Sequence, residues 1–295
     1  MTEFLQSLVR GLGTGSTYAL LAIGFVILYK STRVISFAQP AFMVTGAVLV
    51  SYLVEAVSFY AAVLVAIALT AMLALGVERT VIRPMVGRPV FAVAIITLGV
   101  DIIIRVVINT YIGRDVRQVG DPWGLSTWEI GGVSIQQRYL AMMVTMAVVV
   151  TALFAFFTYT RTGLAMRATA FDQETALAQG ISVGMVFALS WAIAGGLAAL
   201  AGVFVGTGAG IDQATWIIAL KALPAIILGG LDSVGGAVAG GLAVGVVESL
   251  VGTYQGDLAP WLGNNFAVVS PYVLMLLVLL VRPYGLFGTR EVIRV

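Results

Sequence analysis

The chain has 295 residues, of which 60% are hydrophobic and 10% are charged, and its net charge is +2. A soluble domain carries roughly a quarter charged residues, so this composition indicates an integral membrane protein. The chain has neither cysteine nor histidine, which excludes disulfides, thiolate chemistry and Ser-His or Cys-His catalysis. Because the commonest metal ligand is also missing, we expect no metal site.

The apolar runs are continuous, and most approach the ~20 residues with which a helix spans a bilayer. Lipid offers no partner to exposed backbone groups, so we expect an all-α polytopic membrane protein with about eight or nine spans, some broken or re-entrant. No segment is long enough to fold as a soluble domain. We therefore expect residues 1–295 to form a single transmembrane domain.

The first expected span covers residues 4–29, and we interpret it as a retained helix because no basic region precedes it. Its Gly11 and Gly15 lie four residues apart, a spacing that favours close helix contact. Polar side chains beside them indicate a helix that faces the protein interior. They are candidates for lining a translocation path, with interhelical hydrogen bonding as the alternative: Ser16, Thr17 and Tyr18.

A polar segment with Lys30 and Arg33 leads to a shorter apolar run from Pro40 to about residue 54, which contains a further path candidate, Thr45. A third run covers residues 57–77. The following segment, ERTVIRPMVGRP, holds three arginines, and the positive-inside rule places it in the cytoplasm. Three spans back along the chain, Lys30 and Arg33 then also lie inside, and the N-terminus lies outside.

The fourth run, residues 90–112, holds Asp101 and Arg105 one helical turn apart near mid-span. Charges at this depth usually pair or face a polar interior, and their i,i+4 spacing favours an ion pair with each other. We interpret the pair as structural. The alternative is that both residues, with Thr97, line or gate the path. The loop at 113–138, with two tryptophans, is expected to be an interfacial segment on the outer face.

The fifth run, residues 139–159, returns the chain to the cytoplasm. It leads into a polar, helix-forming segment at about 161–182 that ends in a glycine suited to terminate a helix. A polar helix between spans suggests contact with something outside the bilayer; a solvated connecting helix is the alternative. The candidate contact residues are Arg161, Arg167, Phe171, Asp172, Glu174, Ala176 and Gly180.

The remaining chain predicts a sixth span at 185–205 and a glycine-rich stretch at 216–252 that is too long for one plain helix. We expect two spans or half-spans there, joined by a turn at LDSV. The last run, residues 266–281, precedes a basic tail, Arg282, Arg290 and Arg294, which places the C-terminus in the cytoplasm. Small-residue pairs indicate close packing, with exposed backbone along the path as the alternative: Gly236, Gly240, Gly241 and Gly245.

No G-x-x-x-x-G-K-[ST] loop is present, and neither lysine, Lys30 or Lys221, follows a glycine-rich turn. We therefore do not expect this chain to hydrolyse ATP. An ion-coupled secondary transporter would need ionisable coupling residues, and Asp101 and Glu248 are the candidates. The sequence shows no convincing partner for Glu248.

Several motifs together resemble one family along nearly the whole chain. The chain is similar to the permease subunits of bacterial branched-chain amino-acid ABC importers, of the high-affinity leucine/isoleucine/valine type, and within them to the shorter subunit of the pair. The motifs are GLGTGSTYALLAIGFVILY, RVISFAQPAFMVTGA, ERTVIRPMVGRP, RTGLAMRATAFDQETALAQGI, LKALPAIILGGLDSVGGAVAGGLAVGVVESL and LLVLLVRPYGLFG.

The resemblance implies a complex in the bacterial inner membrane, with a second homologous permease, two cytoplasmic ATPases and an extracytoplasmic binding protein. ATP and Mg²⁺ would bind the ATPases, and this chain would need no cofactor, enzyme activity or nucleic acid. Importer permeases dock on the ATPase through an E-A-A-x-x-x-G pattern, whose spacing Glu174, Ala176 and Gly180 keep, with Thr175 in place of an alanine. The family usually has uncharged residues where this chain has Asp101 and Arg105. Urea, short amides or another small organic solute are alternative cargoes.

Overall fold

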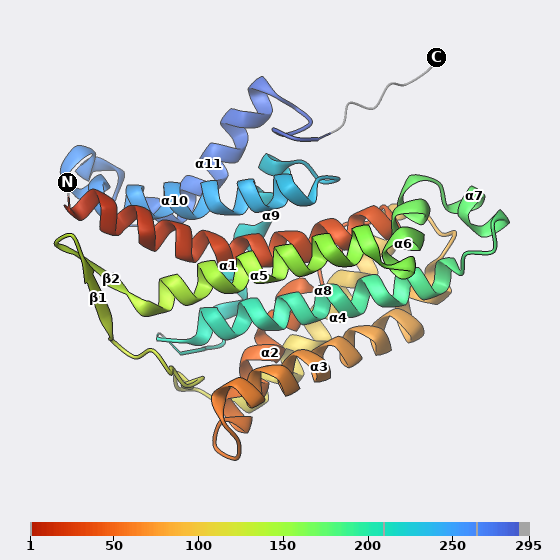
Figure 1. Cartoon of the computed structure of the whole chain (residues 1–295), viewed down its shortest axis with the longest axis horizontal. Helices are drawn as coiled ribbons and strands as arrows, with labels where there is room; N and C mark the ends of the chain where they lie inside the picture. The colour runs from red at the N-terminus through yellow and green to blue at the C-terminus, as the bar shows by residue number, and fades with distance from the viewer. Residues whose placement is uncertain (1, 209, 264, 289–295) are drawn as a thin grey trace. The chain divides into compact units, whose positions relative to one another are not determined.

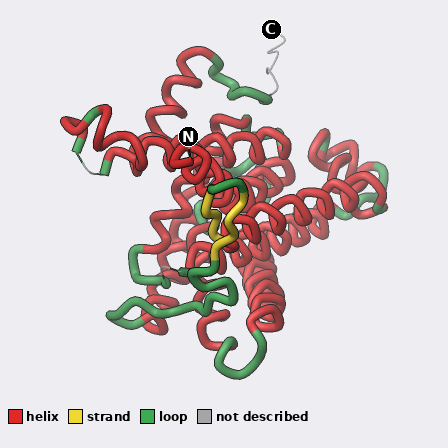
Figure 2. The backbone as a smooth tube through the Cα atoms, turned by 60° about the vertical axis from the view of Figure 1, so that its left-hand side comes forward, coloured by secondary structure: helices red, strands yellow, loops and turns green. Residues whose placement is uncertain are grey.

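The computed structural model describes residues 2–208, 210–263 and 265–288. Most of them are helical (Figure 2). Two compact units divide the chain: the first contains residues 1–26, 123–146 and 220–295, and the second contains residues 27–122 and 147–219. Helices α1 (Thr2–Thr32) and α5 (Gln137–Tyr159) contribute residues to both units.

The second unit is built around helix α2 (Gln39–Leu53), which contacts α3 (Phe59–Val77), α4 (Val90–Ile112) and α8 (Val183–Gly206) (Figure 1). Small residues allow α2 and α8 to approach closely. A Cβ atom on Gly46 of α2 would lie 2.5 Å from the Cβ of Ala199 in α8. Phe42 and Trp191 add an edge-to-face ring contact with centroids 6.2 Å apart across the same pair of helices.

A π-helical turn (Glu78–Ile82) and a 3₁₀ turn (Arg83–Met85) continue α3. The buried Glu78 carboxylate accepts a hydrogen bond from Arg83 Nε at 3.2 Å. Arg83 Nη2 also donates to the carbonyl of Gly184 at 3.1 Å, at the start of α8. This basic loop is therefore fixed to the end of the unit at which α8 begins.

The first unit contains α9 (Ala222–Gly229), α10 (Val234–Leu258) and α11 (Phe266–Val281), with α10 in contact with the other two. Short 3₁₀ turns at Thr215–Lys221 and Pro260–Leu262 precede α9 and follow α10. The Ser233 side chain caps α10 by accepting from the N–H of Gly236 at 3.0 Å. The expected break at LDSV is thus confirmed.

A β-hairpin, β1 (Thr127–Ile130) and β2 (Val133–Gln136), lies in the loop that was expected to be an interfacial segment (Figure 2). Gly131 and Gly132 form its tight turn with φ of 61° and 81°. Two left-handed residues in a two-residue loop are the signature of a type I′ turn, which matches the twist of antiparallel strands. The all-α fold class is confirmed, and this short hairpin is a local exception to it.

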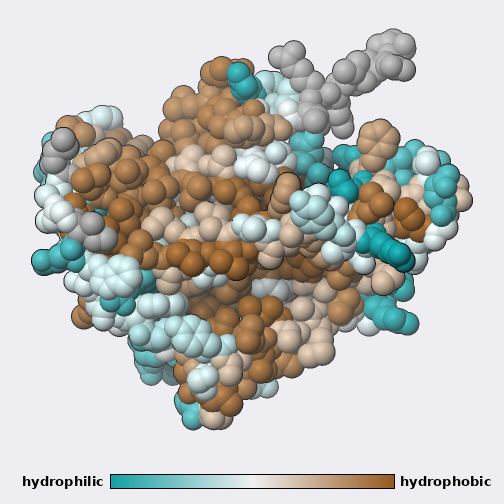
Figure 3. All heavy atoms as spheres, in the orientation of Figure 1, coloured by the Kyte–Doolittle hydropathy of each residue, from teal (hydrophilic) through white to brown (hydrophobic). Residues whose placement is uncertain are grey.

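Six helices of the described chain are long and apolar enough to cross a membrane: α1, α3 with its extension to Met85, α4, α5, α8 and α10. Shorter apolar helices cover Gln39–Leu53, Thr215–Gly229 and Phe266–Val281. Apolar side chains are also exposed along the spans, as expected for lipid-facing helices (brown in Figure 3). The chain is an integral membrane protein, whereas eight or nine spans and a single domain stay predictions.

Candidate functional site

The polar segment after α5 forms two helices, α6 (Arg161–Phe171) and α7 (Gln173–Ala178), which meet at Asp172. Asp172 is extended, and its Oδ1 accepts hydrogen bonds from the N–H groups of Glu174 at 2.9 Å and Thr175 at 3.0 Å. The Thr175 hydroxyl donates to Oδ2 at 2.7 Å. The hydrogen bonds from Thr175, followed by that from Glu174, hold the pKa of the Asp172 carboxyl below its usual value. The break in the polar segment is therefore an N-cap.

The candidate contact residues of this segment lie mainly on its surface. Phe171 is 91% exposed and Leu177 is 63% exposed, although both are large and apolar. Gly180, with φ of 82°, ends α7 where expected, and the N–H groups of Gly180 and Ile181 bond to Leu177 and Ala176 in a Schellman motif. The remaining candidates are exposed, except for the buried Ala176: Arg161, Arg167, Asp172 and Glu174.

Two long side chains attach this segment to the C-terminal end of α1 and to Arg33, which follows it. Gln173 Nε2 donates to the carbonyl of Ser31 at 2.9 Å, and Arg33 Nη2 donates to the carbonyl of Ala170 at 3.1 Å. Arg33 itself has φ of 57°, a left-handed conformation that is uncommon for arginine. Gln173 is not among the predicted contact residues, because nothing in the local pattern distinguishes it from a solvated glutamine.

Backbone N–H groups at the start of α2 donate hydrogen bonds to side chains of α4. Thr97 Oγ1 accepts from the N–H of Phe37, and Asp101 Oδ1 accepts from the N–H of Ala41, both at 3.0 Å. Asp101 Oδ2 also pairs with Arg105 Nε at 2.7 Å, so the expected ion pair is present. The Arg105 guanidinium lies 3.9 Å from the ring centroid of Trp216. Asp101 thus satisfies one free N–H at a helix start while it pairs with a cation.

A second buried ion pair lies in the first unit, where Lys221 Nζ donates to Glu248 Oε1. The other carboxylate oxygen, Oε2, accepts from the Tyr18 hydroxyl at 2.8 Å. The Lys221 and Glu248 side chains are only 11% and 18% exposed. Neither partner of Glu248 was predicted, because both come from other helical segments of the chain.

The uncharged path candidates are mostly engaged within their own helices. The Ser16 hydroxyl donates to the Leu12 carbonyl at 2.8 Å, and the Thr45 hydroxyl donates to the Ala41 carbonyl at 2.7 Å. Thr17 is buried and its hydroxyl has no partner within the described residues. The described residues also contain no group of three acidic side chains that could hold a metal ion.

The predicted packing glycines lie at buried positions where backbones meet. A Cβ atom on Gly11 would lie 2.7 Å from Val246 Cα, and one on Gly15 would lie 2.8 Å from Leu242 Cα. Their partners on α10, Gly241 and Gly245, face the backbone of α1, whereas Gly236 and Gly240 face that of α9. These glycines allow direct contact between helix backbones.

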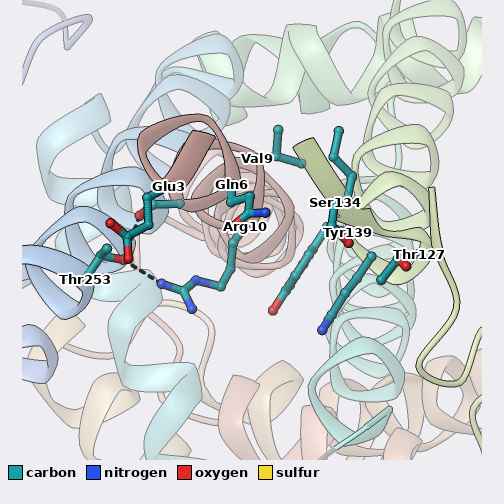
Figure 4. A pocket seen from close by; sticks show the side chains of 11 residues that line it. Glu3, Gln6, Val9, Arg10, Thr127, Ser134, Tyr139 and Thr253 are labelled. Carbon is teal, nitrogen blue, oxygen red and sulfur yellow. Dashed lines mark hydrogen bonds between the residues drawn. The ribbon is translucent and has the colours of Figure 1, made fainter. Parts of the chain in front are cut away.

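A polar cavity of about 380 Å³ opens in the first unit between the N-terminal end of α1 and the hairpin (Figure 4). Arg10 of α1 lies on its wall and donates to two hydroxyls of α10, Ser249 Oγ at 3.1 Å and Thr253 Oγ1 at 2.7 Å. The same hydroxyls bond to Ser7. None of these residues is among the candidates predicted from the sequence.

Residues 7–279 match the family profile described as the branched-chain amino acid transport system permease component. The chain belongs to this permease family. It is 31% identical to the high-affinity branched-chain amino acid permease protein LivH of Salmonella typhimurium, over 99% of this chain and 98% of that protein. It is 30% identical to the corresponding protein BraD of Pseudomonas aeruginosa, over the same shares of the two chains.

A solved structure, PsaBC from Streptococcus pneumoniae in complex with Fab, is similar with a TM-score of 0.53 and 16% identity. It covers 93% of this chain and 90% of that one, and this likeness concerns the fold alone. The family membership and the apolar helices together identify the chain as a multi-pass membrane permease of the ABC transporter class.

Proposed function

We propose that this chain is a translocating subunit of an ATP-driven, binding-protein-dependent importer that carries branched-chain, hydrophobic amino acids. The observation that carries the proposal is the end-to-end similarity to LivH and BraD, whose names state this transport. The chain would pair with a second homologous permease, and two cytoplasmic ATPases would bind ATP and Mg²⁺. An extracytoplasmic binding protein would deliver the amino acid, so the permease itself would not need to bind it tightly.

The α6–α7 segment is the proposed contact surface for the ATPase. The exposed apolar side chains of Leu164, Phe171 and Leu177 on this segment suit a groove on a partner protein. The basic loops support this placement, because Arg33 and Arg83 bond to α6 and to the start of α8 at the same end of the second unit. By the positive-inside rule this end lies on the cytoplasmic side of a bacterial inner membrane, and the N-terminus lies outside. Arg290 and Arg294, which would place the C-terminus inside, lie outside the described residues.

Movement of α7 would reach the membrane part of the second unit through two hydrogen bonds. Gln173 connects α7 to the last turn of α1, and Arg33 connects α6 to the segment between α1 and α2. The start of α2 is held in turn by Thr97 and Asp101. When the ATPases close on ATP, the paired contact segments would be drawn together. The start of α2 would then be displaced, and hydrolysis would reset it.

Uptake of labelled leucine into proteoliposomes that contain the whole complex tests the function. We expect uptake to require ATP, the binding protein and the ATPases, and to be inhibited by vanadate. Uptake that persists without the ATPases would refute the proposal and favour an ion-coupled carrier. Competition by urea and short amides would reveal a different cargo.

Two variants test the connection to α2. Gln173→Ala and Arg33→Ala should leave the complex assembled and its ATPase active, while leucine uptake per ATP hydrolysed falls several-fold. Gln179→Ala is the matched control, since Gln179 is exposed on the same segment and its side chain makes no hydrogen bond within the described residues. Unchanged uptake per ATP in both variants would contradict the connection.

A further inference from the structure

The cavity at the N-terminal end of α1 has walls of two kinds. One wall is the helical face that carries Glu3, Gln6 and Arg10, which are spaced so that they lie on the same side of α1. The opposite wall comes from the hairpin and Tyr139. Figure 4 shows the Arg10 side chain between Glu3 and Thr253 on one side and the Tyr139 ring on the other. By the expected topology this end of α1 faces the extracytoplasmic side.

Arg10 is held in place without a counter-ion. Its Nε and Nη2 donate to the hydroxyls of Ser249 and Thr253, so the guanidinium is oriented by neutral groups. Within the described residues, no carboxylate lies within ion-pair distance of Arg10, and Nη1 makes no hydrogen bond. An oriented guanidinium with a free edge is suited to bind a carboxylate through two parallel hydrogen bonds.

Glu3 lines the same cavity and likewise forms no ion pair within the described residues. A cation and an anion that share a cavity but do not pair with each other leave both charges for a ligand. Val9, Ile135 and the Tyr139 ring provide apolar surface between the polar groups. The volume of about 380 Å³ falls in the range of roughly 300–1,000 Å³ typical of small-molecule pockets.

We propose that this cavity is a low-affinity receiving site for the zwitterionic head of an α-amino acid. Arg10 binds the carboxylate, Glu3 binds the ammonium group, and the side chain lies against Tyr139. The proposal rests on the proposed function, because it takes the amino acid to be the cargo. The site would hold a released amino acid at the outer end of the permease before it enters the membrane part.

Ligand-observed NMR on the complex in nanodiscs, without the binding protein, tests the site. We expect L-leucine to give saturable transfer signals. Leucinamide, which lacks the carboxylate, and 4-methylpentanoate, which lacks the ammonium group, should each bind at least about tenfold more weakly, because each loses a charge-assisted hydrogen bond. Equal binding of the three compounds would overturn the proposal.

Variants locate the binding. Arg10→Gln and Glu3→Gln should weaken leucine binding about tenfold or more, and Ser134→Trp should block the cavity without touching either charge. Arg114→Gln, an exposed arginine in another loop, should bind leucine as the wild type does. If both Arg10→Gln and Ser134→Trp bind leucine as the wild type does, the site is refuted. Because the two variants test the site independently, poor folding of one leaves the other as a test.

The same variants show whether Arg10 binds the carboxylate of a free amino acid or that of an acidic side chain of the binding protein. If Arg10→Gln weakens docking of the binding protein but leaves leucine binding unchanged, the arginine binds an acidic side chain of that protein, and the receiving site is refuted. If the wild type takes up leucine with ATP but shows no leucine binding without the binding protein, the receiving site is refuted and the proposed function is not. Leucine binding without ATP-driven uptake would instead contradict the proposed function.

Discussion

Replacing Asp101 with asparagine removes one charge of a buried pair and leaves the other in place. The Asp101 side chain is 5% exposed and that of Arg105 is 19% exposed, so the arginine cannot regain full hydration. Breaking a buried pair on one side costs about 3–5 kcal/mol. Arg105 keeps its contact with the Trp216 ring, and an asparagine oxygen can still accept from the Ala41 N–H. We therefore expect Asp101→Asn to lower the unfolding free energy by about 3 kcal/mol, near the lower end of that range.

Reversible unfolding of the purified protein by SDS in mixed micelles measures this loss. The double variant Asp101→Asn/Arg105→Gln should recover most of it, since no charge then stays buried. Glu55→Gln is the control, because Glu55 pairs with Arg117 at 3.8 Å while its side chain is 75% exposed, and its loss should stay below about 1 kcal/mol.

A cost for Asp101→Asn no larger than that of the control would refute the reasoning. Leucine uptake by the double variant then separates the two roles of the pair. Recovery of stability together with uptake is the result for a structural pair, whereas recovery of stability without uptake would show that the pair acts in the path.

Three further predictions follow from the geometry. Lys221→Met should cost about 3–5 kcal/mol by leaving Glu248 buried without its cation, and Lys221→Met/Glu248→Gln should recover most of this in the same SDS assay. Gly15→Ala should cost about 1–3 kcal/mol through overpacking, whereas Gly256→Ala, whose Cβ would meet no atom within 4 Å, should be neutral or stabilising; equal losses would contradict the packing argument. The pKa of Asp172 is lowered on folding, so its cap stabilises α7 fully above the unfolded pKa of about 3.9. This stabilisation is lost as pH falls through the lower folded pKa. Hydrogen exchange of the first α7 amides should show this loss of protection in the wild type but no such pH step in Asp172→Ala.

The helices were predictable because their signal is local. Hydrophobic length alone placed α4 at residues 90–112 and α11 at residues 266–281, which are their observed bounds. The Asp101–Arg105 pair was equally accessible, since i,i+4 spacing on one helix brings the side chains together. The hairpin was not predicted, although Gly131–Gly132 between alternating residues is a recognisable turn signal, because the composition of the chain favours membrane-spanning helices.

The contacts of the candidate sites were less accessible, because they join segments that are distant in sequence. Glu248 meets Lys221 and Tyr18 only after three helical segments pack. Gln173 bonds to a backbone carbonyl 142 positions earlier in the chain, and a carbonyl carries no residue-specific signal. The division of the polar segment at Asp172 was not predicted, although aspartate favours N-caps over helix interiors.

The contact of α1 with α10 through glycine backbones has a consequence for how the first unit can move. Packed helices slide past each other by small changes of side-chain rotamers in the layer between them. Where Gly15 meets Leu242 Cα and Gly11 meets Val246 Cα, that layer is missing. Residues 2–26 and α10 should therefore move as one rigid body during transport. Spin labels on these two segments should keep a constant separation while ATP binds and is hydrolysed, and the bending must be accommodated elsewhere in the chain.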